Sequence, residues 1–145
     1  MVKVEQPGLV THDGVELTTD LDSNPMAAGT ARGVVRTAVQ RWHLPNLVDT
    51  LLLAVTELVT NAVRHGRAPV ILTLRRTAGE LSLRVHDADP TEPVLNPECT
   101  NDADAESGRG MQIVTALADR TGCEQITDDG KVVFASFRTP PPADG

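Results

Sequence analysis

The hydrophobic pattern of this chain changes its period close to residue 66, and the change limits the folds that are open to it. From about Asn46 to His65, apolar residues recur at every third or fourth position, which is typical of an amphipathic helix. From Pro69 onward, Val70, Leu72 and Leu74 alternate with polar residues, which is typical of a half-buried strand. The chain therefore predicts an α/β domain in which helices pack on a sheet.

The same two periods and the turn residues predict the remaining elements. The expected order is a strand at 15–21, helices at 25–44 and 46–65, strands at 70–75 and 81–86, a helix at 111–120, and strands at 123–127 and 131–137. We expect Gly66 to end the second helix in a left-handed conformation and Gly122 to follow the third. Strands that arrive as hairpins predict a mixed, mainly antiparallel sheet with the three helices on one face, a two-layer α/β sandwich.

The length of 145 residues suits a single core. We expect a tail at 1–14, one domain at 15–139 and a second tail at 140–145, because the end segments lack sustained periodicity. Residues 88–107 are rich in proline and acidic residues and match no regular element. A loop of this length is either functional or disordered, and we interpret it as a lid.

Charge and composition argue against several classes of partner. The net charge of −7 repels nucleic acid and anionic lipid, so neither is an expected partner. The first residues lack the pattern of a signal peptide, and we find no apolar stretch near the ~20 residues of a bilayer span, so we expect a cytoplasmic protein. The two cysteines lack metal-ligand spacing and are interpreted as reduced thiols.

Three polar residues follow the apolar face of the second predicted helix. Glu57, Asn61 and His65 are four residues apart, which places a carboxylate, an amide and an imidazole along one stripe. Such a stripe suits a nucleotide site, because Mg²⁺ prefers oxygen ligands and commonly takes only one or two from protein. A solvated helix face explains the same spacing equally well.

Two further features suit a nucleotide. Asp87 ends a predicted strand, where an acceptor-only carboxylate can recognise an adenine amino group, although a turn-initiating aspartate is the commoner explanation. Gly108-Arg109-Gly110 precedes a predicted helix, whose free amides favour phosphate. G-x-G alone is a weak signal, and the P-loop, the G-x-G-x-x-G fingerprint and the G-x-S-x-G elbow are absent from the sequence.

Together these segments form a pattern that is far less accidental than any one of them. In chain order, ELVTNAVRHG, VHDADP, a long loop and SGRGMQIV resemble the histidine-kinase-like ATPase domains, over about residues 17–138. The closest resemblance is to the bacterial anti-sigma-factor serine kinases. It implies a Bergerat-type ATP-binding fold and a homodimer.

The resemblance also implies roles for individual residues. It makes Glu57 the catalytic base, Asn61 the Mg²⁺ ligand, Asp87 the adenine-binding residue, and Gly108 and Gly110 the phosphate-facing glycines. Further positions that it places at the ATP site are Arg64, His65, Arg109 and Met111. The chain departs from the family where D-x-G-x-G is expected, because residues 87–91 read D-A-D-P-T and both glycines are missing.

The function expected from this resemblance is that of an ATP-dependent serine/threonine kinase whose substrate is an anti-anti-sigma protein. The alternative is a non-catalytic partner-switch module that sequesters a sigma factor or another regulator, and the missing glycines favour it. ATP hydrolysis that drives a conformational cycle ranks below both, because the resembling proteins need transducer domains for it.

Overall fold

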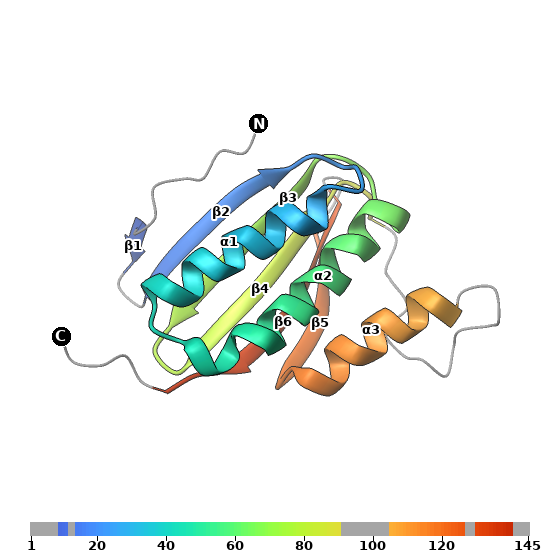
Figure 1. Ribbon diagram of the computed structural model, residues 1–145. Coiled ribbons are helices and arrows are strands. Elements are labelled where there is room, and N and C mark those ends of the chain that lie inside the picture. Colours follow the sequence, from blue (N-terminus) through green and yellow to red (C-terminus); the bar gives the residue numbers. More distant parts are fainter. Residues whose placement is uncertain (1–8, 12–13, 91–104, 127–129, 141–145) are drawn as a thin grey trace.

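The computed structural model describes residues 9–11, 14–90, 105–126 and 130–140. Three helices cover one face of a six-stranded sheet (Figure 1). The predicted two-layer α/β sandwich is therefore confirmed. The elements in chain order are β1 (Leu9–Thr11), β2 (Gly14–Leu21), α1 (Ala27–Arg41), the 3-10 turn η1 (Pro45–Leu47), α2 (Val48–His65), β3 (Val70–Thr77), β4 (Glu80–Asp87), α3 (Ala105–Leu117), β5 (Arg120–Gln125) and β6 (Lys131–Arg138).

The sheet has the strand order β1-β2-β3-β4-β6-β5. All pairings among the described strands are antiparallel, so the parallel component expected of a mixed sheet is not seen there. β1 lies within the segment 1–14 that the sequence analysis assigned to a tail, and its three residues pair with β2. The hairpin of β3 and β4 turns at Gly79, which has the positive φ of 84° that glycine tolerates best.

Helix α1 begins two residues later than the proline at position 25 predicted. The side chain of Asn24 accepts a hydrogen bond from the backbone N–H of Met26 at 2.7 Å, and its carbonyl accepts one from Ala27 at 3.0 Å. Asparagine thus bonds the backbone two residues on, in the manner of an Asx turn, and the helix follows this turn.

Helix α2 is the central helix of its layer (Figure 1). Its apolar stripe is buried on the sheet and comprises Leu51, Ala54, Val55, Leu58, Val59 and Ala62. With η1 it forms the segment Pro45–His65, which by length and a mean hydropathy of 1.3 could cross a membrane, contrary to the sequence-based expectation. Its packing in the core accounts for that hydropathy, since a core helix passes the same test.

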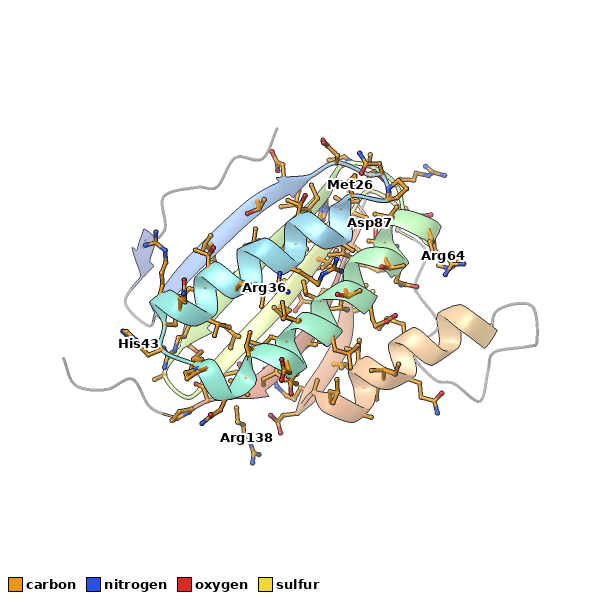
Figure 2. The ribbon with its side chains drawn as sticks, viewed as in Figure 1. Met26, Arg36, His43, Arg64, Asp87 and Arg138 are labelled. Atoms are coloured by element: carbon orange, nitrogen blue, oxygen red, sulfur yellow. The ribbon has the colours of Figure 1, made fainter. Side chains whose placement is uncertain are left out.

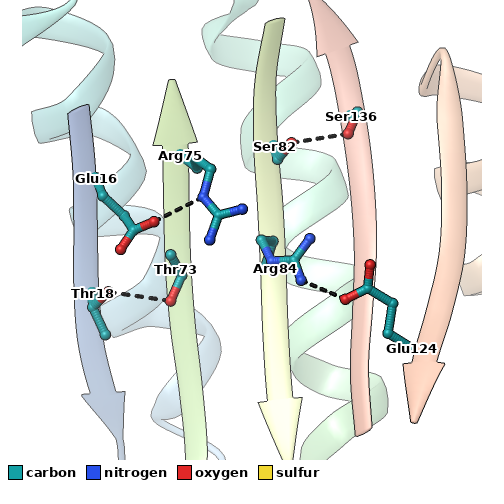
Figure 3. Close-up of polar contacts among 8 residues, drawn as sticks. All are labelled: Glu16, Thr18, Thr73, Arg75, Ser82, Arg84, Glu124 and Ser136. Atoms are coloured by element: carbon teal, nitrogen blue, oxygen red, sulfur yellow. Dashed lines mark hydrogen bonds and ion pairs between the residues drawn. The ribbon is translucent and has the colours of Figure 1, made fainter. Parts of the chain in front are cut away.

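The face of the sheet that turns away from the helices is polar and pairs with itself (Figure 3). Arg75 lies 2.8 Å from Glu16 and Arg84 lies 2.7 Å from Glu124, while the hydroxyls of Ser82 and Ser136 are 2.9 Å apart. These cross-strand pairs give partners to polar side chains on the sheet face that the helices do not cover, including the buried hydroxyls of Ser82 and Ser136.

The segment around β5 differs from its prediction. α3 ends at Leu117 rather than at residue 120, and Gly122 lies inside β5 instead of behind the helix. A Cβ on Gly122 would come within 2.8 Å of the Phe134 ring, which lies in the neighbouring strand. Within α3, Val114 is buried, whereas Ile113 and Leu117 are more than a third exposed.

Arg76 is a buried cation at the end of the sheet that lies away from Asp87. Its guanidinium donates to the carbonyl oxygen of Trp42 at 2.7 Å and, more weakly, to that of Pro140 at 3.4 Å. Burial lowers the pKa of Arg76 below its usual value. Because Trp42 is the C-cap of α1, the positive charge also opposes the negative end of the helix dipole.

Two glycine substitutions test this packing. Gly33 is exposed within α1 and a Cβ there meets nothing within 4 Å, so Gly33→Ala should stabilise the protein by about 0.5–1 kcal/mol through helix propensity. Gly122→Ala should instead destabilise it, because the added methyl displaces the Phe134 ring. Urea unfolding measures both, and equal shifts of the same sign would contradict the placement of Gly122.

Candidate functional site

Asp87 is a buried carboxylate at the end of β4, on the sheet face that carries the helices and beside the C-terminal end of α2 (Figure 2). Its Oδ1 atom accepts hydrogen bonds from Lys131 Nζ at 3.1 Å and from the backbone N–H of Asp89 at 2.8 Å. The backbone N–H of Arg67 makes a longer contact of 3.4 Å to the same atom. No described residue donates to Oδ2.

Lys131 is a site residue that sequence reasoning missed. It is the first residue of β6, it stands directly opposite Asp87 in the strand register, and its side chain is only 5 % exposed. Its Nζ donates to the carbonyl oxygen of Asp89 at 2.8 Å as well as to Asp87. The signal available in the sequence is that Lys131 is in phase with the inward-facing residues Val133, Ala135 and Phe137.

Gly66 brings the end of α2 against this ion pair. The expectation of a left-handed Gly66 is wrong, because its φ is −99°. Residue 66 is glycine because neighbouring atoms leave no room for a side chain. A Cβ there would lie 2.5 Å from the carboxyl carbon of Asp87 and 2.6 Å from its Oδ2 atom. It would also lie 2.7 Å from the carbonyl oxygen of Ala62. A hydrogen bond of 2.9 Å from the backbone N–H of Ala88 to the backbone carbonyl of Arg67 also links the segment after β4 to the segment after α2.

Glu57 lies against the backbone of α3. A Cβ on Gly110 would overlap Oε2 of Glu57 and lie 3.4 Å from its carboxyl carbon, so the absence of a side chain at Gly110 makes room for this carboxylate. Gly108 and Gly110 lie within α3, not ahead of it as predicted. The free amides of a helix belong to its first four residues, so the N–H of Gly110 is inside the helical ladder.

The remaining predicted residues divide between the stripe on α2 and the core. Asn61 is half-buried, one turn after Glu57, and Arg64 and His65 are exposed in the last turn of the helix. Figure 2 shows Arg64 at this end of α2. Met111 is buried in the core, so only its main chain can face a ligand. Arg109 lies in α3, but its side chain is outside the described residues. Of the lid expected at 88–107, residues 91–104 also lie outside the described residues, and residues 105–107 belong to α3 instead of a loop.

Helix α2 sets the separation between the two carboxylates. Glu57 and Gly66 are nine residues apart, which at the rise of a helix is about 13 Å along its axis. Because Gly66 touches Asp87 and Gly110 touches Glu57, one helix carries a carboxylate contact at each end of an elongated site.

The described residues contain no group of three or more His, Cys, Asp or Glu side chains that could hold a metal ion by themselves. Mg²⁺ does not need such a group in a nucleotide site, since phosphate and water supply most of its ligands. The oxygens of Asn61 and Glu57 are hard ligands of the kind that Mg²⁺ accepts, so the residues present fit a metal that arrives with a nucleotide.

These features define a small α/β domain with an elongated, carboxylate-ended site along its central helix. The chain belongs to the histidine kinase-like ATPase domain family, whose model matches residues 21–137. Membership implies that the domain binds ATP. No curated protein matches the chain.

Asp87→Asn tests the role of the buried carboxylate. The change removes the counter-charge of Lys131, so we expect a loss of stability of about 3 kcal/mol. It also replaces a charged acceptor, which should weaken ATP binding by about 1–3 kcal/mol. Urea unfolding and titration calorimetry measure the two effects, and Asp49→Asn, which changes an exposed carboxylate in the first turn of α2, is the control. Unchanged ATP affinity would remove Asp87 from the site.

Proposed function

We propose that the protein is an ATP-dependent serine/threonine kinase of the anti-sigma type, located in the cytoplasm, which phosphorylates an anti-anti-sigma partner. The observation that carries the proposal is the pair of close glycine contacts, Gly66 with Asp87 and Gly110 with Glu57, at the two ends of one site. Family membership supports the nucleotide, and the stripe on α2 supports the transfer chemistry.

Each end of the site has a distinct task in this proposal. Asp87 would hold the adenine through Oδ2, the carboxylate oxygen that no described residue occupies. Asn61 would hold Mg²⁺ beside the phosphates. ATP supplies the phosphoryl group, and the metal offsets the charge that develops on it.

Glu57 is the proposed general base. Its carboxylate would accept the proton of the partner's hydroxyl as the oxygen attacks the phosphoryl group. The contact with Gly110 limits where this carboxylate can lie, and positioning of that kind is a large part of phosphoryl-transfer catalysis.

The second candidate function is a non-catalytic partner switch that binds ATP and acts by sequestering a regulator. Two observations favour it. Residues 87–91 lack both expected glycines, and the Asp87 carboxylate is already paired with Lys131. Both proposals include a homodimer and a protein partner, and they differ in whether Glu57 performs chemistry.

Two substitutions on α2 separate these functions. Glu57→Ala should leave ATP affinity nearly unchanged but lower phosphorylation of the partner by ~10² or more, because a general base acts mainly in the transition state. Asn61→Ala should weaken Mg²⁺-dependent ATP binding as well, because the metal contacts protein and phosphates in the ground state. Calorimetry with and without Mg²⁺ and transfer of radiolabelled phosphate to a co-purified partner measure the two effects.

Asp49→Ala is the control, since it removes an exposed carboxylate from the first turn of the same helix. If the wild-type protein transfers no phosphate, while Glu57→Ala still sequesters the partner normally, the kinase proposal fails and the partner switch replaces it.

A further inference from the structure

Arg76 is a buried cation that no carboxylate balances in the part of the chain that the structure describes. The residue is only 8 % exposed, and its guanidinium contacts the backbone carbonyls of Trp42 and Pro140. A buried charge is costly unless it is paired, and a carbonyl carries only a partial charge. Burial causes the lowered pKa of Arg76, an effect that a neighbouring carboxylate would oppose. Arg76 therefore keeps the capacity to bind an anion.

One edge of this guanidinium is almost unused. Nη1 donates to the carbonyl of Trp42 at 2.7 Å, whereas Nη2 reaches the carbonyl of Pro140 only at 3.4 Å, which is longer than an ordinary N–H···O bond. The Nε atom is buried and has no hydrogen-bond partner among the described residues. Nε–H and the Nη2–H beside it form a fork that two oxygens of one carboxylate, phosphate or sulfate group accept together. The partner that fits this edge is a bidentate oxyanion.

Thr139 adds a second polar group at the same end of the sheet. It is 8 % exposed, and none of the described residues forms a hydrogen bond with its buried Oγ1 atom. Its N–H donates to the carbonyl of Gly79 at 3.0 Å, and it directly precedes Pro140, whose carbonyl contacts Arg76. Because Thr139 is in phase with the buried Phe137, its side chain lies on the same sheet face as that of Arg76. The hydroxyl can therefore donate to an anion that the guanidinium holds.

We propose that Arg76 and Thr139 form an anion site, which binds a carboxylate, phosphate or sulfate group. The anion replaces the weak contact between Nη2 and the Pro140 carbonyl. It accepts hydrogen bonds from Nε–H and Nη2–H of Arg76 and from the hydroxyl of Thr139. Through the bond from Arg76 to Trp42, it links the end of α1 to the end of β6, and these two ends lie at the same side of the sheet (Figure 1).

This anion site is separate from the proposed nucleotide site. Leu81 stands opposite Arg76 in the strand register, and Asp87 follows it on β4 after about 20 Å of strand. The inference therefore does not rest on the proposed function, and an anion bound at Arg76 leaves the ATP site accessible.

Nuclear magnetic resonance of the Arg76 Nε–H group tests the site directly. Isotope-labelled protein is titrated at constant ionic strength with phosphate, with sulfate and with acetate, and chloride is the reference anion. The proton signal of this group, assigned by its loss in Arg76→Lys, should move downfield and saturate with a Kd below about 10 mM for at least one oxyanion. Tightest binding of acetate identifies a carboxylate as the natural ligand, whereas tightest binding of phosphate or sulfate identifies a tetrahedral oxyanion.

Two variants test the two residues of the site. Thr139→Val keeps the Arg76 signal but removes the hydroxyl donor, so the Kd should rise about 5-fold. Arg76→Met removes every donor, so the rise in the urea midpoint that the anion causes should be lost. Arg75→Met is the matched control, because it removes the neighbouring arginine from the opposite face of the same strand. Sulfate and phosphate stabilise proteins generally, so the measure is the difference between these two methionine variants.

The inference fails if none of the three oxyanions gives a saturable shift, or if chloride gives a shift of the same size. Arg76 is then only a cap for the end of α1. An unchanged Kd in Thr139→Val overturns the site of two residues. If Arg76→Met does not fold, the wild-type titration and Thr139→Val decide, because neither depends on that variant.

Discussion

The buried contact between Asp87 and Lys131 is the interaction on which the arrangement of the site depends. Removing two charges from water is costly, and the pair repays this only with hydrogen bonds of good geometry, here to the backbone of Asp89. Gly130, the residue before β6, makes the approach possible. Gly130 has a φ of 104°, and a Cβ there would overlap the carbonyl oxygen of Asp87. The same few atoms therefore fix the end of β4, the start of β6 and the end of α2.

Helix α2 connects this point to the rest of the site. Its buried stripe fixes its height above the sheet, so its polar stripe must face the space beside α3. Glu57 and Gly66 then lie at set positions along one rigid element, and sites on helices are held more precisely than sites on loops. Cross-strand pairs link several polar side chains on the other sheet face, whereas the helical side carries the carboxylates with unused acceptors.

Most of the fold could be predicted from the sequence, and most of the errors have one cause. Periodicity identified α2 and the hairpin of β3 and β4, because local patterns decide those elements. It could not show why positions 66 and 122 are glycine. The reason is a contact with a distant segment in each case, Gly66 with Asp87 and Gly122 with Phe134. Lys131 was missed for the same reason: only the register of β4 and β6 shows that a lysine faces the aspartate. Glu57, Asn61 and Asp87 could be proposed from the sequence because each ends or follows a clear pattern.

The two glycines of α3 complete this reasoning from local to tertiary structure. Sequence reasoning placed Gly108 and Gly110 ahead of the helix, but both are helical, and only Gly108 is among the first four residues, whose amides are free. Glycine costs a helix about 1 kcal/mol relative to alanine, so two of them make the first turns of α3 the part with the lowest cost of unwinding. Gly110 is nonetheless retained inside the helix, because a side chain there would collide with Glu57. Gly110 thus both weakens α3 and makes room for the carboxylate of Glu57, so the start of this helix is coupled in structure to the polar stripe on α2.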